Sequence, residues 1–333
     1  MRAWQVGELG EPENVMVLGE AEVPEPGPGQ ALVRVRAAAL NFPDVLMVRG
    51  HYQDRPPLPF TPGIELCGEV VAHGAGVSDP PVGTRVLGLT TMPHGALAEY
   101  ALAPAADLHP APSELDDAAA ASLWVAYQTG WLALHRRAGL RQGETLLVHA
   151  AAGGVGRAAV QLGKAAGARV VGVVGGAEKV AVAQRMGADA VVDRTSCADP
   201  GAFVAALREA CGPGGADVVY DPVGGGAFTA STKVVGFEGR ILVIGFASGE
   251  IPQAATNHAL VRNYGILGVY WGLYRSRAPE VVAEAAAALD ELVARGAIAP
   301  LVSSRLPLEE AAQGVAALAS GRTTGRVVVE LSR

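Results

Sequence analysis

The chain has 333 residues, of which 50% are hydrophobic and 18% are charged, and its formal net charge at pH 7 is -7. This length predicts two domains, and the hydrophobic fraction is ample for a buried core in each. The charge is spread along the chain without acidic or basic blocks, which argues against nucleic acid as the main partner.

No apolar run approaches the roughly 20 residues of a membrane span, because Gly, Arg, Asp or Pro interrupts each one. The first residues, MRAWQVGELGEPENV, contain no apolar signal core. We therefore expect a soluble cytoplasmic protein with no membrane partner. Cys67, Cys197 and Cys211 show no C-x-x-C spacing, so neither a disulfide framework nor a cysteine zinc cage is expected.

Short apolar runs divided by Gly/Pro turns fill roughly the first 110 residues, as in a β-rich, barrel-like domain. We expect strands there at Gln30 to Ala37, Gly68 to His73, Thr84 to Leu89 and Ala98 to Ala103. A helix-forming alanine run from Ser113 to His135 then leads into the next part of the chain.

A strand, a glycine turn and a helix follow in immediate succession. Thr145 to His149 reads as a buried parallel strand, and Val155 to Ala166 as a helix that Gly167 caps in a left-handed conformation. The turn between them has the pattern A-x-x-G-x-x-G. Side chains at its glycines would keep a pyrophosphate from the backbone amides or separate helix from strand. We therefore expect more than a tight turn, namely a dinucleotide site at Ala152, Gly153, Gly154, Val155 and Gly156.

Strands and helices continue to alternate beyond this turn. We expect strands at Arg169 to Val174, Ala190 to Val192, Ala216 to Tyr220, Arg240 to Gly245 and Gly265 to Tyr270. Helices are expected at Glu178 to Met186, Ala202 to Ala210, Ala227 to Val235 and Pro279 to Arg295. Six strands with right-handed helical crossovers make a doubly wound parallel sheet.

The carboxy-terminal residues from 301 onward read as a strand, a helix and a strand that we expect to return to the first domain. The expected division is one domain of residues 1–122 with 273–333 and a dinucleotide-binding domain of residues 123–272.

Five segments carry a resemblance to a known family. They are ALNFPDVLMVRGHY at 39–52, PGIELCGEV at 62–70, HAAAGGVG at 149–156, VVYDPVGG at 218–225 and TTGRVVVE at 323–330. The chain resembles the medium-chain dehydrogenase/reductase superfamily, and within it the zinc-lacking, ζ-crystallin-like quinone oxidoreductases. The resemblance covers nearly the whole chain. It implies an α/β fold class with a β-rich GroES-like barrel domain and a Rossmann domain.

Alcohol dehydrogenases of this superfamily ligate zinc where this chain has Asn41, Ile64 and Val125, none of which ligates zinc. We therefore expect no metal. Alcohol oxidation relies on zinc to stabilise an alkoxide, whereas a quinone or enone accepts hydride with only a modest proton donor. The resemblance implies NADPH-dependent reduction of quinones. Two alternatives stay open: an enoyl-thioester or enone double-bond reductase, and a nucleotide-binding protein with little turnover.

Asn41, Asp44 and Tyr52 stand in the family's N-F-x-D and G-x-Y positions, which implies that they lie beside the nicotinamide and are the candidates for that proton donor. Each also has a structural interpretation. Asn41 can hold a loop by side-chain bonds, Asp44 can begin a helix, and Tyr52 can be a wall of the cleft. Thr129 matches a family threonine near the nicotinamide, and it can equally bond back to its own helix.

Further cofactor contacts are expected beside the nicotinamide and at the ends of the sheet strands. These candidates are Phe42, Val223, Gly245, Phe246, Val269, Tyr270 and Trp271. The aromatic residues among them can also be core.

The end of the second strand decides between NAD and NADP(H). Val174 stands where an NAD enzyme has an acid for the ribose hydroxyls. The resemblance places the 2′-phosphate beside Gly176 and Lys179, with Arg194 and Arg322 as further contacts. We expect NADP(H), although Glu178 is a carboxylate that could bind the ribose unless it points to solvent.

The family commonly pairs dinucleotide domains edge to edge. The Gly265 to Tyr270 strand is apolar enough to be the covered edge, so we expect a homodimer. The alternative is that this strand is interior or capped by a loop.

Overall fold

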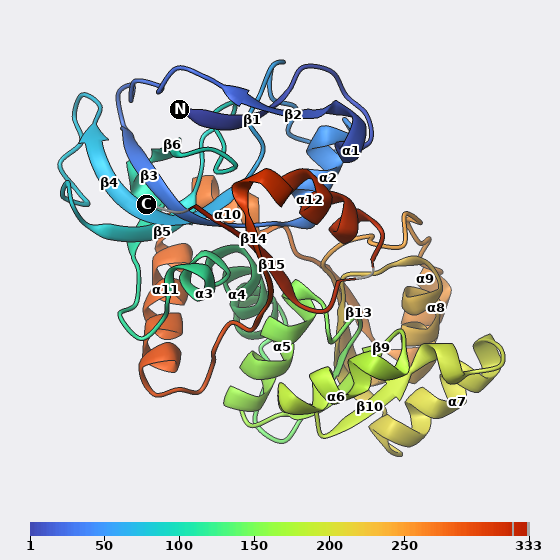
Figure 1. The fold of residues 1–333 in the computed structure, drawn as a ribbon. Helices are drawn as coiled ribbons and strands as arrows, with labels where there is room; N and C mark the ends of the chain where they lie inside the picture. The colour runs from blue at the N-terminus through green and yellow to red at the C-terminus, as the bar shows by residue number, and fades with distance from the viewer. Residues whose placement is uncertain (322, 332–333) are drawn as a thin grey trace. The chain divides into compact units, whose positions relative to one another are not determined.

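The computed structural model describes residues 1–321 and 323–331. The chain forms two compact units, Met1–Val125 with Ala299–Arg333, and Ala126–Ile298 (Figure 1). No helix in the described ranges is long and apolar enough to cross a membrane.

The first unit is built on a seven-stranded sheet in the order β14-β15-β3-β4-β5-β7, with β6 paired to β3. These strands are β3 Gln30–Ala39, β4 Glu65–His73, β5 Arg85–Leu89, β6 Tyr100–Pro104, β7 Leu108–Pro110, β14 Val302–Pro307 and β15 Arg326–Glu330. A two-stranded sheet of β1 Arg2–Val6 and β2 Met16–Glu20 completes the β structure. Inward-facing Val, Leu and Ala side chains of these strands form its core.

The carboxy-terminal return is confirmed, because β15 pairs antiparallel with β3 (Figure 1, red beside blue). The helices of this unit are α1 Pro12–Val15, α2 Phe42–Val48, α3 Asp117–Ala121 and α12 Ala311–Ala319. The helix α4, Trp124–Trp131, contains the point where the chain passes into the second unit.

The second unit is a six-stranded sheet in the order β10-β9-β8-β11-β12-β13, with all pairs parallel. The strands are β8 Thr145–Val148, β9 Arg169–Val174, β10 Ala190–Asp193, β11 Ala216–Asp221, β12 Val235–Val243 and β13 Gly265–Gly268. The helices are α5 Gly154–Ala165, α6 Ala177–Arg185, α7 Pro200–Cys211, α8 Gly225–Val234, α9 Thr256–Arg262, α10 Trp271–Arg277 and α11 Pro279–Ala294. The predicted doubly wound sheet is confirmed, and its order reverses between β8 and β11, where such folds bind cofactors.

The helical run expected from Ser113 to His135 is interrupted in the structure. The structure has two short helices, α3 and α4, followed by a π-helical segment, Leu132–Arg137. The break falls at Ser122, whose hydroxyl donates to the carbonyl of Ala118 at 2.9 Å. Such a bond back to the preceding turn competes with continuation of the helix.

The expected strands ending at Gly245 and Tyr270 are also too long. β12 ends at Val243, and β13 pairs only with Arg240–Val243, so it ends at Gly268 with its partner. β12 begins earlier than expected, at Val235, and the register shift between Ala216 and Val218 accommodates the irregular stretch that follows.

The observed division of the chain differs from the expected one at residues 123–125, which belong to the first unit, and at residues 273–298, which pack in the second unit. One bond that holds them there joins the Gln128 side-chain amide to the carbonyl of Val282 on α11, at 3.1 Å.

Candidate functional site

The glycine turn lies between β8 and α5, as the sequence predicts. Ala150 begins it in a left-handed conformation with φ of 50°, and the amide of Gly153 donates to the carbonyl of Ala150 at 2.8 Å. A Cβ at Gly156 would collide with that same carbonyl oxygen. Glycine at this position therefore lets α5 pack against the turn. Ala152 precedes the helix, and Gly154 and Val155 are its first residues, whose backbone N–H groups lack intrahelical partners and suit an anion.

Two buried side chains that the sequence analysis did not single out brace the loops around this turn. His149 is 1% exposed, and its Nε2 lies 2.8 Å from Oγ of Ser231 on α8. Asp221, 2% exposed at the end of β11, accepts from the amides of Val223 and Gly224 at 2.8 and 3.0 Å. Polar residues at the ends of buried strands were the available signal.

Charged side chains surround the tip of β9, where the sequence analysis expects the 2′-phosphate or ribose. The amide of Gly176 donates to Oδ1 of Asp193 at 2.9 Å, and this bond holds the pKa of Asp193 below its ordinary value. A Cβ at Gly175 would lie 3.0 Å from Nε of Arg194, so the guanidinium packs against the turn.

Glu178 lies on the other side of the same turn. A Cβ at Gly176 would lie 2.5 Å from its carboxylate oxygens. The carboxylate therefore folds back over the start of α6, and the residue is exposed to solvent. Lys179 is half-buried in the first turn of α6. The turn is therefore flanked by the guanidinium of Arg194 beside Gly175 and by the carboxylate of Glu178 beside Gly176.

The remaining cofactor candidates of the second unit lie where β11, β12 and β13 end. The loop after β11 contacts the loop after β12, because a Cβ at Gly224 would lie 3.1 Å from the ring of Phe246. Val223 follows β11, and Gly245 and Phe246 follow β12. The residues that follow β13 are Val269, Tyr270 and Trp271. Trp271 is 8% exposed whereas Tyr270 is 46% exposed, so Trp271 is mainly core. Thr129 is half-buried in α4.

The residues that we expect beside the hydride acceptor lie in the first unit. Asn41, 4% exposed, donates from Nδ2 to the carbonyl of Ala39 at 3.0 Å and to Oε2 of Glu65 at 2.8 Å. Its Oδ1 accepts from Arg326 at 2.8 Å. Both amide hydrogens of Asn41 are thus used within the protein, and none is left for a substrate.

Glu65 and Arg326 were missed in the sequence analysis. They form a buried ion pair with side chains 0% and 7% exposed. Oε1 of Glu65 also accepts from the amide of Val125 at 2.8 Å. Burial raises the pKa of Glu65, and the charge of Arg326 opposes this shift. Glu65 lies in the segment PGIELCGEV and Arg326 in the segment TTGRVVVE, so both motifs were visible in the sequence. Their pairing was not, because 261 residues separate them.

Asp44 is fully buried and braces two chain segments. Its carboxylate accepts from the amides of Asn41 at 2.7 Å and of Gly63 and Ile64 at 3.1 Å each. Burial raises the pKa of Asp44 to about 6, against these backbone bonds, which lower it. This arrangement matches the helix-start interpretation of Asp44, since α2 begins at Phe42.

Tyr52 is half-buried and packs against the core of the first unit, and Phe42 is half-buried as the first residue of α2. Arg322, the last of the predicted phosphate contacts, lies outside the described residues.

The three positions that correspond to zinc ligands, Asn41, Ile64 and Val125, are hydrogen-bonded within the protein. Glu65 binds both the Asn41 side chain and the Val125 amide, while Ile64 donates its amide to Asp44. Within residues 1–321 and 323–331, no three His, Cys, Asp or Glu side chains are grouped so that they could hold a metal ion.

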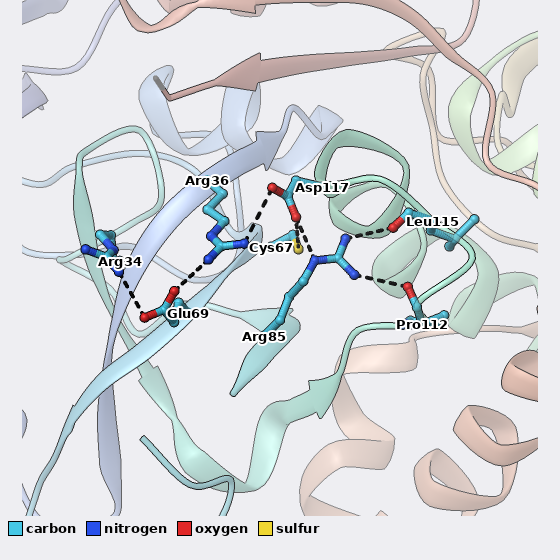
Figure 2. A network of polar contacts seen from close by, with 8 residues as sticks. All are labelled: Arg34, Arg36, Cys67, Glu69, Arg85, Pro112, Leu115 and Asp117. Atoms are coloured by element: carbon cyan, nitrogen blue, oxygen red, sulfur yellow. Dashed lines mark hydrogen bonds and ion pairs between the residues drawn. The ribbon is translucent and has the colours of Figure 1, made fainter. Parts of the chain in front are cut away.

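Cys67 belongs to a separate polar network of the first unit (Figure 2). Its thiol donates to Asp117, which also accepts from Arg85 at 2.7 Å. Burial raises the pKa of Cys67 to about 12, so the thiol stays protonated at neutral pH. The network joins β4 and β5 to α3, and its role is structural.

Comparison with known proteins agrees with this architecture. Residues 27–113 match the family model of the alcohol dehydrogenase GroES-like domain, and residues 154–287 match that of zinc-binding dehydrogenases. The chain is 35% identical to a quinone oxidoreductase-like protein 2 homolog of Nematostella vectensis, over 98% of this chain and 88% of the relative. It is also 32% identical to a phthioceranic/hydroxyphthioceranic acid synthase of Mycobacterium tuberculosis, over 98% of this chain but 15% of the synthase.

Among solved structures, the chain resembles the quinone oxidoreductase of Thermus thermophilus, which was determined also in complex with NADPH. The TM-score is 0.82 at 34% identity, with 99% of this chain and 100% of that chain covered. The two family models, the relative of similar length and this structure agree on one assignment. The chain belongs to the medium-chain dehydrogenase/reductase superfamily, among its quinone oxidoreductase-like members.

Proposed function

We propose that the protein reduces quinones with NADPH by direct hydride transfer and without a metal. The observation that carries this proposal is the bonding of the three zinc-ligand positions, where Asn41 and Val125 are held by Glu65. A site built this way suits an acceptor that needs no Lewis acid.

NADP(H) fits the second unit. The glycine turn leaves the start of α5 open to a pyrophosphate, and Arg194 packs against Gly175 where a 2′-phosphate would bind. A similar quinone oxidoreductase was solved with NADPH. Bound NADPH supplies the hydride, and the residues of this chain orient it and exclude water.

Tyr52 is the remaining candidate for the proton donor. Asn41 has no hydrogen to give, and the carboxylate of Asp44 is enclosed by three backbone amides. A tyrosine hydroxyl can donate to the oxyanion that develops on a reduced quinone. Its alternative role, as a wall of the cleft, predicts no loss of rate when the hydroxyl alone is removed.

A second class of acceptor is supported by the match to part of an acid synthase. On that basis we keep enone or enoyl-thioester reduction as the second candidate. The third possibility, nucleotide binding with little turnover, differs from both in a rate measurement.

The test is the rate of NADPH oxidation by the purified protein with simple benzo- or naphthoquinones, with an enone, with an enoyl thioester and with no acceptor. We expect quinones to give the highest kcat/KM, undiminished in chelator, and elemental analysis to give less than one zinc per chain. Enoyl thioesters better by orders of magnitude would establish the second candidate, and no turnover with any acceptor the third.

The Tyr52→Phe variant tests the donor. We expect a loss of at least about tenfold in kcat, since general acids contribute about a hundredfold or more where proton transfer limits the rate. Tyr100→Phe, at a half-buried tyrosine of β6, is the matched control. The cytoplasmic location expected from the sequence is part of the same proposal, and cell fractionation tests it.

A further inference from the structure

Glu65 and Arg326 take no part in the hydride or proton transfer proposed above, yet they bind Asn41, which the family resemblance places beside the nicotinamide. We propose that Glu65 and Arg326 are positioning residues, which fix the carboxamide of Asn41 and the first turn of α4 in the absence of a metal. This inference rests on the proposed function, because it assigns a task within the same site.

The pair lies at one end of the sheet of the first unit. Glu65 is the first residue of β4 and is paired with Ala39, the last residue of β3, while Arg326 is the first residue of β15. Asn41 follows β3 by two residues. Three strand ends therefore converge where a single buried ion pair can bind all of them.

Each oxygen of Glu65 has a defined partner. Oε1 accepts from the amide of Val125 in the first turn of α4, at 2.8 Å. Oε2 accepts from Nδ2 of Asn41 at 2.8 Å and from Arg326. A carboxylate near a helix amino terminus is favourable, so Glu65 fixes the start of α4 as well as Asn41.

Arg326 divides its guanidinium between two acceptors. One NH₂ group donates to Oδ1 of Asn41 at 2.8 Å and the other to Glu65. A planar guanidinium reaches two acceptors at once in fixed directions, whereas a lysine ammonium is a point charge on a flexible stem. Lysine would keep the ion pair with Glu65 and lose the hold on Asn41.

This difference separates positioning from stability. A buried ion pair contributes little to stability by comparison with apolar packing, but it can fix one arrangement of the groups around it. A purely structural role predicts a lower Tm and less folded protein with an unchanged kcat for each folded site. Positioning predicts a lower kcat at sites that still bind NADPH normally.

The first experiment compares Arg326→Lys with Arg305→Lys. Arg305 is a matched control because it lies on the neighbouring strand β14 and pairs with Asp116 and Glu330 at the surface, 46% exposed. For Arg326→Lys we expect kcat, normalised to sites that bind NADPH, to fall about 10- to 100-fold, as a misplaced group costs in an active site. The NADPH dissociation constant should stay within about twofold, since the pair lies outside the glycine turn. The control should keep both.

The second experiment moves the charge. Asn41→Asp places a carboxylate against Glu65, and two such carboxylates cannot both ionise easily. We expect kcat and Tm of this variant to fall as pH rises, with a titration that the native protein lacks. The double variant Asn41→Asp/Glu65→Gln leaves one carboxylate in the contact and should remove that titration. Persistence of the titration in the double variant would overturn the proposed contact.

The results distinguish the two proposals. If the native protein oxidises NADPH with none of the acceptors tested, the proposed function fails and the positioning role fails with it. If the native protein turns over and Arg326→Lys keeps the full kcat for each NADPH-binding site, only the positioning role is overturned, and the pair is structural.

Discussion

Nε2 of His149 lies 2.8 Å from Oγ of Ser231, in the core directly before the glycine turn. Ser231 gives its own hydrogen to the carbonyl of Ala227 at 2.8 Å, so its oxygen accepts and Nε2 of His149 is the donor. Burial lowers the pKa of His149, although the nearby charge of Asp221 opposes the shift. The bond fixes the tautomer and joins the end of β8 to α8.

The His149 shift makes stability depend on pH in a stated direction. Well above pH 6.5, the ordinary value, the imidazole is neutral in both folded and unfolded chains. Below it the unfolded chain takes up a proton that the folded chain resists, so stability is lost as pH falls, by up to about 1.4 kcal/mol for each pH unit. Urea unfolding of the native protein and of His149→Gln from pH 7.5 to 5 should show a smaller loss in the variant. An equal loss in both, with exposed His51→Gln as control, would contradict the assignment.

We expect Arg194 and Glu178 to set the choice between NADPH and NADH. Arg194→Ala should weaken NADPH binding about ten- to hundredfold and leave NADH nearly unchanged, because a charge-assisted bond to the 2′-phosphate is lost. Glu178→Gln should act in the opposite direction, since it removes a carboxylate that would repel the phosphate. Fluorescence titration with both cofactors is the measurement. Arg185→Ala, at the exposed far end of α6, is the control, and equal efficiency of both cofactors in the native protein would refute the assignment.

Gly156 is required by the carbonyl of Ala150. In Gly156→Ala the new methyl group collides with that oxygen, so α5 must move away from the turn. Such a shift typically costs about 1–3 kcal/mol, and we expect lower stability together with at least tenfold weaker NADPH binding. Gly226→Ala is the matched control, because its Cβ would meet nothing within 4 Å in α8. Similar behaviour of the two variants in thermal unfolding and cofactor titration would refute the argument.

Three exposed apolar side chains of the second unit, Phe237, Leu260 and Val261, are candidates for the surface that the expected homodimer would cover. These side chains are 74%, 77% and 77% exposed, and β13 is the last strand of the described sheet on that side. Burying each would contribute about 1.5–3 kcal/mol. Leu260→Glu/Val261→Glu should therefore shift the protein from dimer to monomer in sedimentation at micromolar concentration. Val17→Glu, exposed in the first unit, should not, and a monomeric native protein would contradict the dimer outright.

The sequence by itself determined the features that depend on neighbouring residues. β8, the glycine turn and α5 lie within about 20 consecutive residues, so hydrophobic periodicity and the need for glycine define them without tertiary information. The six alternating strands followed from the same periodicity. The sequence also shows directly that Asn41, Ile64 and Val125 are not zinc-ligating residue types, because each position can be read without its neighbours.

Only the tertiary structure decided which polar side chains of the first unit are already hydrogen-bonded within the protein. Asn41 was expected as a candidate donor, and its hydrogens are consumed because Glu65 and the carbonyl of Ala39 lie beside it. The ion pair between Glu65 and Arg326 joins residues that are 261 positions apart in the chain. Hydrophobic periodicity and local spacing cannot predict a contact between residues so far apart. The direction of the Glu178 carboxylate likewise depends on rotamers set by the turn it packs against. Local interactions fixed the elements, whereas burial and the pairing of distant charges fixed the chemistry of the site.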